Sequence, residues 1–128
     1  MDKANPLCTP MIGRTLNVDK DPFRPKEENE EVLGPEVPYL SVIGALMYLT
    51  NCTRPDIAFA VNLLARFSSC PTKRHWKGIK HIFRYLRGTS DYGLFYPNNT
   101  KPVLHGYAGA GYLSDSHNSK SQIGYVFT

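Results

Sequence analysis

Long hydrophobic runs are missing from this sequence of 128 residues. No stretch approaches the roughly 20 apolar residues that a transmembrane helix needs, so we expect no membrane partner. Residues 1–10 lack the apolar segment of a secretory signal peptide, and the protein is not expected to be secreted. The three cysteines are few and scattered, which is typical of a reducing compartment rather than a disulfide framework. The expected location is cytoplasmic or nuclear.

Acidic residues are scarce after residue 37, where the chain offers only Asp56, Asp91 and Asp115. Hydrolysis of a phosphodiester by two metal ions needs several converging carboxylates. Asp56 follows Thr53 by three residues, as in a capping box, and the other two aspartates fall in expected turns. We therefore expect no catalytic residue, no metal site and no cofactor.

Side chains for other kinds of catalysis are equally few. Cys52 and Cys70 lie near expected helix ends without an evident base. His75 and His81 are six residues apart and project to different faces of a straight helix, so one metal ion cannot bind both. The sequence predicts a protein that is not an enzyme.

Positive charge, by contrast, is concentrated in one part of the chain. Residues 1–37 carry five basic and eight acidic side chains, a net charge of −3. Residues 38–90 carry eight basic side chains and one acidic, a net charge of +7, whereas residues 91–128 carry two of each. A basic block of this kind suits a polyanionic partner, and it is equally compatible with a solvated helical face.

The chain divides into three zones. Residues 1–37 contain five prolines, an acidic run and no sustained apolar period. We expect this first zone to be an extended, mobile leader. Residues 38–90 predict a three-helix bundle. The first two helices are indicated by apolar residues at helical spacing: Tyr39, Val42, Ile43, Leu46 and Leu49, then Ile57, Ala60, Val61, Leu64 and Phe67. The third runs from about Thr72 to Arg87, with Gly88 suited to a left-handed residue beyond its end.

Residues 91–128 have the composition of strands. Three runs are β-prone: Tyr92–Tyr96, Val103–Tyr107 and Ile123–Thr128. A loop containing Gly109, Gly111 and the polar stretch Ser114–Ser121 is expected before the last of them. Because three strands without a following helix leave one sheet face uncovered, the predicted sheet is incomplete. The predicted fold class is α+β, a three-helix bundle followed by an incomplete three-stranded antiparallel sheet.

The third helix carries the clearest functional pattern. At 100° per residue, five cations fall within an arc of roughly 80°, and they are Lys73, Lys77, Lys80, Arg84 and Arg87. An apolar stripe lies beside them, formed by Trp76, Ile79, Phe83 and Leu86. At 1.5 Å per residue the ridge is about 21 Å long, enough for several phosphates of one strand. The pattern predicts nucleic-acid binding without base specificity, and a lipid surface is disfavoured because the apolar stripe is needed to bury the bundle.

Several sequence motifs resemble the Pol polyprotein of copia-type LTR retrotransposons. The first is the run from Tyr39 to Thr50 followed by Thr53-Arg54-Pro55-Asp56-Ile57-Ala58. The others are Pro71-Thr72 with His75-Trp76-Lys77, and Arg84-Tyr85-Leu86-Arg87-Gly88-Thr89. Together they are highly specific, and the resemblance extends over essentially the whole of residues 1–128.

The resemblance implies a place within a larger machine. Residues 38–90 are similar to the thumb or connection region of reverse transcriptase, and residues from about 91 onward to the opening strands of ribonuclease H. In that family the polymerase carboxylates lie upstream and most ribonuclease carboxylates downstream, so neither active site is complete here. A first methionine that coincides with an internal methionine of the family indicates a truncated or degenerate copy.

One departure from the family concerns the first ribonuclease strand. The family pattern there is Y-x-D-x-D-W, whereas this sequence has Gly109 and Gly111 at the two aspartate positions. The expected function is a catalytically inactive Pol segment that binds an RNA–DNA hybrid or another nucleic acid non-specifically. The alternatives are a protein-interaction or effector-like module, whose protein partners the sequence does not identify, a non-functional relic, and a working nuclease.

Overall fold

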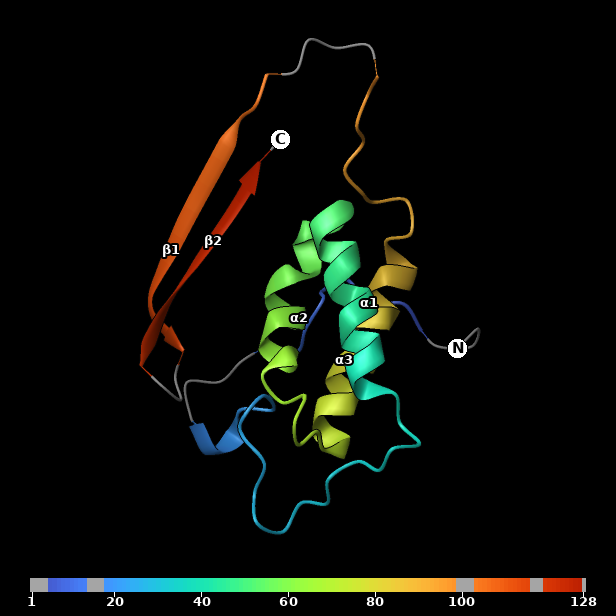
Figure 1. The fold of residues 1–128 in the computed structure, drawn as a ribbon, viewed down its shortest axis with the longest axis vertical. Coiled ribbons are helices and arrows are strands. Elements are labelled where there is room, and N and C mark those ends of the chain that lie inside the picture. The colour runs from blue at the N-terminus through green and yellow to red at the C-terminus, as the bar shows by residue number, and fades with distance from the viewer. Residues whose placement is uncertain (1–4, 14–17, 99–102, 116–118, 128) are drawn as a thin grey trace.

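Three α-helices pack together and are followed by a β-hairpin that lies on the α2 side of the helices (Figure 1). The computed structural model describes residues 5–13, 18–98, 103–115 and 119–127. The elements in chain order are a 3-10 turn at Val18–Lys20, α1 at Tyr39–Cys52, a 3-10 turn at Pro55–Ile57, α2 at Ala58–Ala65, α3 at Lys73–Gly88, β1 at Gly106–Asp115 and β2 at Lys120–Phe127. This arrangement confirms the α+β class. No described helix is both long and apolar enough to cross a membrane.

Helix α1 forms where the apolar period predicted it. Tyr39, Ile43 and Leu46 recur at intervals of four and three residues and are buried on one side of the helix. The Tyr39 hydroxyl donates a hydrogen bond of 2.9 Å to the carbonyl oxygen of Leu64, which ties α1 to α2. This bond satisfies the one polar atom that Tyr39 brings into the core.

The second predicted apolar stripe is also confirmed, because all five of its residues are buried: Ile57, Ala60, Val61, Leu64 and Phe67. The predicted capping box at Thr53 is wrong. Arg54 holds the N-cap position of the Pro55–Ile57 turn without a side-chain cap bond, and α2 begins only at Ala58. Asp56 instead binds the Arg54 guanidinium. A hydrogen bond to a charged donor is stronger than one to a backbone N–H.

Helix α3 begins with a capping box at Thr72 and His75. Its core-facing residues are His75, Gly78, Ile79, Ile82 and Tyr85. These lie opposite the predicted cation ridge rather than beside it, so the expected docking stripe is displaced around the helix. Trp76, Phe83 and Leu86 pack at the edge of the core and are only half-buried.

The end of α3 also differs from the prediction. Gly88 is the last helical residue, and no described glycine has a positive φ. A side chain at Gly88 would approach the Leu7 carbonyl oxygen and the Pro6 Cβ to 3.0 Å. Gly88 therefore allows the leader to cross close to the helix instead of providing a left-handed cap.

The leader is part of the fold. Phe23 is 2% exposed and belongs to the core cluster, where its ring lies 3.4 Å from the ideal Cβ position of Gly78. Asp21 is fully buried and its Oδ1 accepts a hydrogen bond of 3.0 Å from the Phe23 N–H. The Leu33 N–H donates to the Pro71 carbonyl oxygen at 2.8 Å. The expectation of a mobile leader is therefore wrong for the described residues around Phe23, because an aromatic side chain buries about 150–250 Å².

Strands β1 and β2 form an antiparallel pair whose register joins Gly106 to Phe127 and Gly111 to Gln122. This two-stranded hairpin is the sheet of the described residues, whereas three strands were predicted. The expected loop residues Gly109 and Gly111 lie inside β1, and Asp115 is the last residue of that strand rather than part of a turn. The sheet is thus smaller than predicted, and its first strand begins later.

The β-prone run Tyr92–Tyr96 forms no strand. Its backbone and side chains bind the end of α1 instead. The Leu94 N–H donates to the Thr53 carbonyl oxygen at 2.9 Å, and the Tyr96 hydroxyl donates to the Cys52 carbonyl oxygen at 2.9 Å. Carbonyl groups at a helix C-terminus lack intrahelical partners, which explains why this segment pairs with the helix rather than with the sheet.

Candidate nucleic-acid interface

The five predicted cations all project from α3 on the side away from the core. Lys73, Lys77, Lys80 and Arg87 are exposed, and Arg84 is half-buried. We call this set the cation ridge. It extends over about 21 Å at the helical rise of 1.5 Å per residue. The nucleic-acid-binding role of these five residues stays a prediction.

The N-terminal end of the cation ridge meets the acidic part of the leader. Lys73 Nζ lies 3.5 Å from Glu31 Oε2, and both side chains are more than three-quarters exposed. The neighbouring Arg74 forms hydrogen bonds of 3.0 and 2.5 Å to the two carboxylate oxygens of Glu30. The hydrogen bond from Arg74 holds the pKa of the Glu30 carboxyl below its usual value. Neither contact was predictable from the sequence, because the partners are more than 40 residues apart.

The C-terminal half of the cation ridge is bordered by residues 5–9 of the leader. Arg84 Nε donates a hydrogen bond of 2.7 Å to the Asn5 carbonyl oxygen, and the Arg84 carbonyl oxygen accepts one of 3.2 Å from the Leu7 N–H. His81 Nε2 lies 3.0 Å from the Thr9 carbonyl oxygen. The leader therefore follows one edge of α3 and orients Arg84, while a carbonyl group leaves the guanidinium charge unneutralised.

A second cationic residue, Arg54, has a different environment. It is 5% exposed, and its guanidinium donates to both carboxylate oxygens of Asp56 at 3.0 and 2.8 Å. It also donates to the carbonyl and hydroxyl oxygens of Thr89 at 2.9 and 2.6 Å. The Tyr85 hydroxyl donates to Asp56 at 2.8 Å. We call these four residues the Arg54 cluster.

The Arg54 cluster holds two helices together. The hydrogen bond from Arg54, followed by that from Tyr85, holds the pKa of Asp56 below its usual value. The same bond raises the pKa of Arg54. Because Asp56 accepts hydrogen bonds from both Arg54 and Tyr85, the cluster connects the start of α2 to the end of α3. The sequence shows that Arg54 and Asp56 are close neighbours, but it does not show that Tyr85 and Thr89, at the end of α3, bind them.

His75 is held as a neutral imidazole. Its Nδ1 accepts a hydrogen bond of 3.1 Å from the Thr72 N–H, so its Nε2 carries the proton and donates to the Arg24 carbonyl oxygen at 3.1 Å. Burial lowers the pKa of His75. Its ring stacks on Phe67 with centroids 4.1 Å apart. His75 thus anchors the leader to α3, and in the part of the chain that the structure describes no three His, Cys, Asp or Glu side chains gather as metal ligands would.

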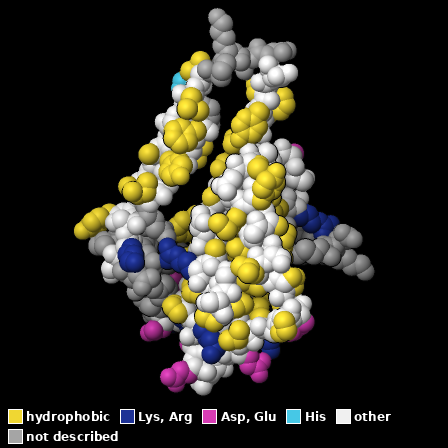
Figure 2. Space-filling model, viewed as in Figure 1, with side chains coloured by type: hydrophobic (Ala, Val, Ile, Leu, Met, Phe, Trp, Pro, Cys, Tyr) yellow, Lys and Arg dark blue, Asp and Glu magenta, His cyan; other side chains and the backbone are white. Residues whose placement is uncertain are grey.

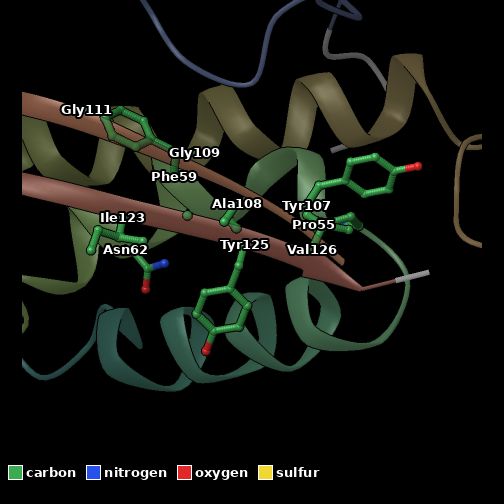
Figure 3. A pocket seen from close by; sticks show the side chains of 12 residues that line it. Pro55, Phe59, Asn62, Tyr107, Ala108, Gly109, Gly111, Ile123, Tyr125 and Val126 are labelled. Carbon is green, nitrogen blue, oxygen red and sulfur yellow. The ribbon is translucent and has the colours of Figure 1, made fainter. Parts of the chain in front are cut away.

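A cleft of about 780 Å³ lies between α2 and the hairpin (Figure 3). Phe59 and Asn62 line it from α2, and Tyr107, Ile123 and Tyr125 line it from the strands. None of the described residues that line it is charged. Gly109 also borders this cleft, with nothing within 4 Å of its ideal Cβ position. The cleft was not predicted from the sequence, because β1 continues beyond the predicted run Val103–Tyr107 into residues that were expected to form a loop.

Comparison with known proteins gives three informative relatives. The chain is 43% identical over all of its 128 residues to a segment covering 9% of the retrovirus-related Pol polyprotein from transposon TNT 1-94 of Nicotiana tabacum. It is 39% identical over 88 residues, 69% of the chain, to 6% of the retrovirus-related Pol polyprotein from transposon RE2 of Arabidopsis thaliana. The chain thus spans less than a tenth of the length of either polyprotein.

The third relative is a shorter protein. The chain is 44% identical over 91 residues, 71% of its length, to 64% of the secreted RxLR effector protein 161 of Plasmopara viticola. No family model matches the chain, and no solved structure matches it. The identities of 39–43% to transposon polyproteins confirm the resemblance carried by the motifs of α1, α2 and α3. The chain belongs to the Pol polyproteins of copia-type retrotransposons.

Proposed function

We propose that this chain is the part of a Pol polyprotein that joins the reverse transcriptase thumb or connection region to the start of ribonuclease H, and that it binds nucleic acid without catalysis. The observation that carries the proposal is the cation ridge: four exposed cations and one half-buried cation on the side of α3 that faces away from the core. The proposed place of action is the cytoplasm or nucleus, in line with three cysteines that are all free thiols.

Phosphate groups are the chemistry that fits the cation ridge. Successive phosphates of a duplex strand are roughly 3.4 Å apart along the axis, so a ridge of about 21 Å faces several of them. Long side chains on a convex helix surface meet the backbone rather than the base edges, which favours binding without sequence preference. An RNA–DNA hybrid is the proposed ligand because the parent family copies RNA into DNA.

The absence of catalysis is proposed from the positions of the acidic groups. Asp56 accepts its hydrogen bonds from Arg54 and Tyr85, and Gly109 and Gly111 occupy the aspartate positions of the family pattern in β1. Gly109 has open space around its ideal Cβ position, so packing does not require glycine there. We expect the Gly109→Asp variant to show no Mg²⁺-dependent cleavage of an RNA–DNA hybrid. Clear cleavage by that variant or by the pure wild-type protein would contradict the proposal.

The binding test is fluorescence anisotropy with a labelled RNA–DNA hybrid across a salt series. We expect affinity to fall steeply with salt, and the double variant Lys77→Glu/Lys80→Glu to bind about tenfold or more weakly at low salt. The matched control is Lys26→Glu/Lys120→Glu, which changes net charge equally at exposed residues outside α3. Affinity that ignores both salt and charge reversal of Lys77, Lys80 and Arg84 would overturn the proposal.

A protein-interaction module is the second candidate, favoured by exposed apolar side chains. Leu40 and Tyr48 on α1 are 68% and 73% exposed, and hydrophobic groups cover much of the face of α1 and the hairpin in Figure 2. Patches of this kind mark interaction sites. The test is a pull-down with wild-type protein and the Leu40→Asp/Tyr48→Asp variant. A partner lost in the variant supports this role, whereas capture of chaperones alone counts against it.

A further inference from the structure

We propose that the acidic leader regulates the nucleic-acid interface by occupying the N-terminal end of the cation ridge. In this arrangement Glu31 competes with phosphate for Lys73, and Arg74 with Glu30 holds the competitor in place. The inference rests on the proposed function, since it concerns the same surface. It predicts that the polyanion is bound by Lys77, Lys80, Arg84 and Arg87, and that Lys73 joins them only when the Glu31 charge is removed.

Arg74 is the anchor of this device. It is 17% exposed, Glu30 is 25% exposed, and two parallel hydrogen bonds join the guanidinium to the carboxylate. Arg74 Nη2 also donates to the Pro25 carbonyl oxygen at 3.2 Å. Bidentate guanidinium–carboxylate pairs are among the stronger polar contacts, so the leader turn is fixed beside the first turn of α3.

The contact between Glu31 and Lys73 has the opposite character. The two charged atoms are 3.5 Å apart, and the side chains are 84% and 78% exposed. An ion pair in this setting contributes little to folding and exchanges readily with other ions. Glu31 therefore neutralises Lys73 and repels an approaching phosphate, while its own removal costs the fold little.

Among the described residues, no carboxylate pairs with Lys77 or Lys80, the next two cations of the ridge. Arg84 is held by the Asn5 carbonyl oxygen, a neutral acceptor that directs the guanidinium without cancelling its charge. Lys77, Lys80 and Arg87 are exposed. The leader thus places a carboxylate beside Lys73 and a neutral carbonyl group beside Arg84, so these two cations of the ridge differ in effective charge.

The experiment is the anisotropy titration with the RNA–DNA hybrid, applied to Glu31→Gln, Lys73→Gln and their double variant. We expect Glu31→Gln to tighten binding by about two- to fivefold at low salt and to steepen the logarithmic salt slope by about one. Lys73→Gln alone should change affinity less than twofold, because that charge is already engaged. The double variant should lose the gain of Glu31→Gln.

Glu28→Gln is the matched control, since it removes the same charge from an exposed residue of the same acidic run. If Glu28→Gln increased the affinity for the hybrid as much as Glu31→Gln does, the effect would come from net charge alone, and the inference would be wrong. The inference would also be wrong if Lys73→Gln weakened binding of the hybrid as much as Lys77→Gln does. If the wild type binds no hybrid even at low salt, the proposed function itself fails, and the inference falls with it.

Discussion

At the residue scale, the most constrained polar groups lie in the Arg54 cluster and at His75, and both serve to join segments that are distant in sequence. Two hydrogen bonds join Arg54 to Thr89, which is 35 residues away in the sequence. His75 and Arg24 are 51 residues apart and share a hydrogen bond. A buried polar group that is fully satisfied fixes one arrangement of its neighbours, because any other arrangement leaves a donor or acceptor unpaired.

The Arg54 cluster makes a prediction about stability. Asp56→Asn removes the carboxylate that faces a nearly buried guanidinium, and we expect the free energy of unfolding to fall by about 2–3 kcal/mol. Urea denaturation followed by circular dichroism measures this loss. Asp91→Asn, a change at an exposed aspartate, is the control and should alter stability by less than about 0.5 kcal/mol. Equal effects of the two substitutions would show that Asp56 does not stabilise the fold.

His75 predicts how stability depends on pH. Burial lowers the pKa of His75 in the folded protein, whereas in the unfolded chain it titrates near the ordinary value of 6.5. The unfolded state therefore binds more protons below about pH 7, and the contribution of the neutral ring is lost as pH falls through 6.5. The slope is bounded by one proton, about 1.4 kcal/mol per pH unit.

The measurement is the free energy of unfolding at pH 7.5 and pH 5 for wild type and His75→Gln. Glutamine has an acceptor oxygen and a donor NH2 group but does not ionise, so we expect a shallower pH dependence in the variant. His105→Gln, at an exposed histidine, is the control and should keep the wild-type slope. A His75→Gln slope identical to that of the wild type would contradict the assignment of the neutral ring.

At the element scale, the helices follow from apolar periodicity, whereas the leader and strands do not. Tyr39, Ile43 and Leu46 have a period that only a helix brings to one side, so α1 was predictable. Phe23 is a single aromatic residue among prolines, and one residue has no period. Gly109 and Gly111 have low strand propensity, yet they pair with Gly124 and Gln122, so the register of the whole hairpin overrides that propensity here.

The same scale explains what could be foreseen of the candidate interface. The arc of Lys73, Lys77 and Lys80 depends only on helix geometry, and the structure places all three exposed on one helix. Their neighbours depend on tertiary packing. Glu31 and Asn5 reach α3 because the leader folds back, and Asn5 is 79 residues from the arginine it contacts. A sequence pattern without helical periodicity does not predict contacts between residues so far apart in the chain.

The leader's place in the core gives the next prediction. Phe23→Ala removes a side chain that is 2% exposed and packs over Gly78, and we expect a loss of about 3–4 kcal/mol in the free energy of unfolding. Urea denaturation measures it, with Phe95→Ala as the control because Phe95 is 85% exposed. If Phe23→Ala were as mild as the control, the leader would contribute nothing to the core.

At the scale of the whole molecule, stability is concentrated in the helices and the leader that packs on them. The buried core cluster consists of Phe23 with residues of α1, α2, α3 and the Pro55–Ile57 turn, and none of the hairpin side chains that the structure describes belongs to it. Both faces of the hairpin are largely apolar, since Tyr107 pairs with Val126 on one face and Ala108 with Tyr125 on the other. Such a ribbon lacks the polar face that a strand pair normally presents to water.

Hydrogen–deuterium exchange tests this division of stability. A two-stranded hairpin is marginally stable, so we expect the amides of Tyr107 and Val126 to exchange through local opening, much faster than those of Ile79 and Ile82 in α3. The helix amides should slow towards the rate set by global unfolding, and Phe23→Ala should accelerate them while leaving the hairpin unchanged. Hairpin amides protected as strongly as Ile79 would mean that the strands and helices unfold as one unit. In that case the hairpin would be part of the cooperative folding unit of the helices, rather than a less stable element next to α2.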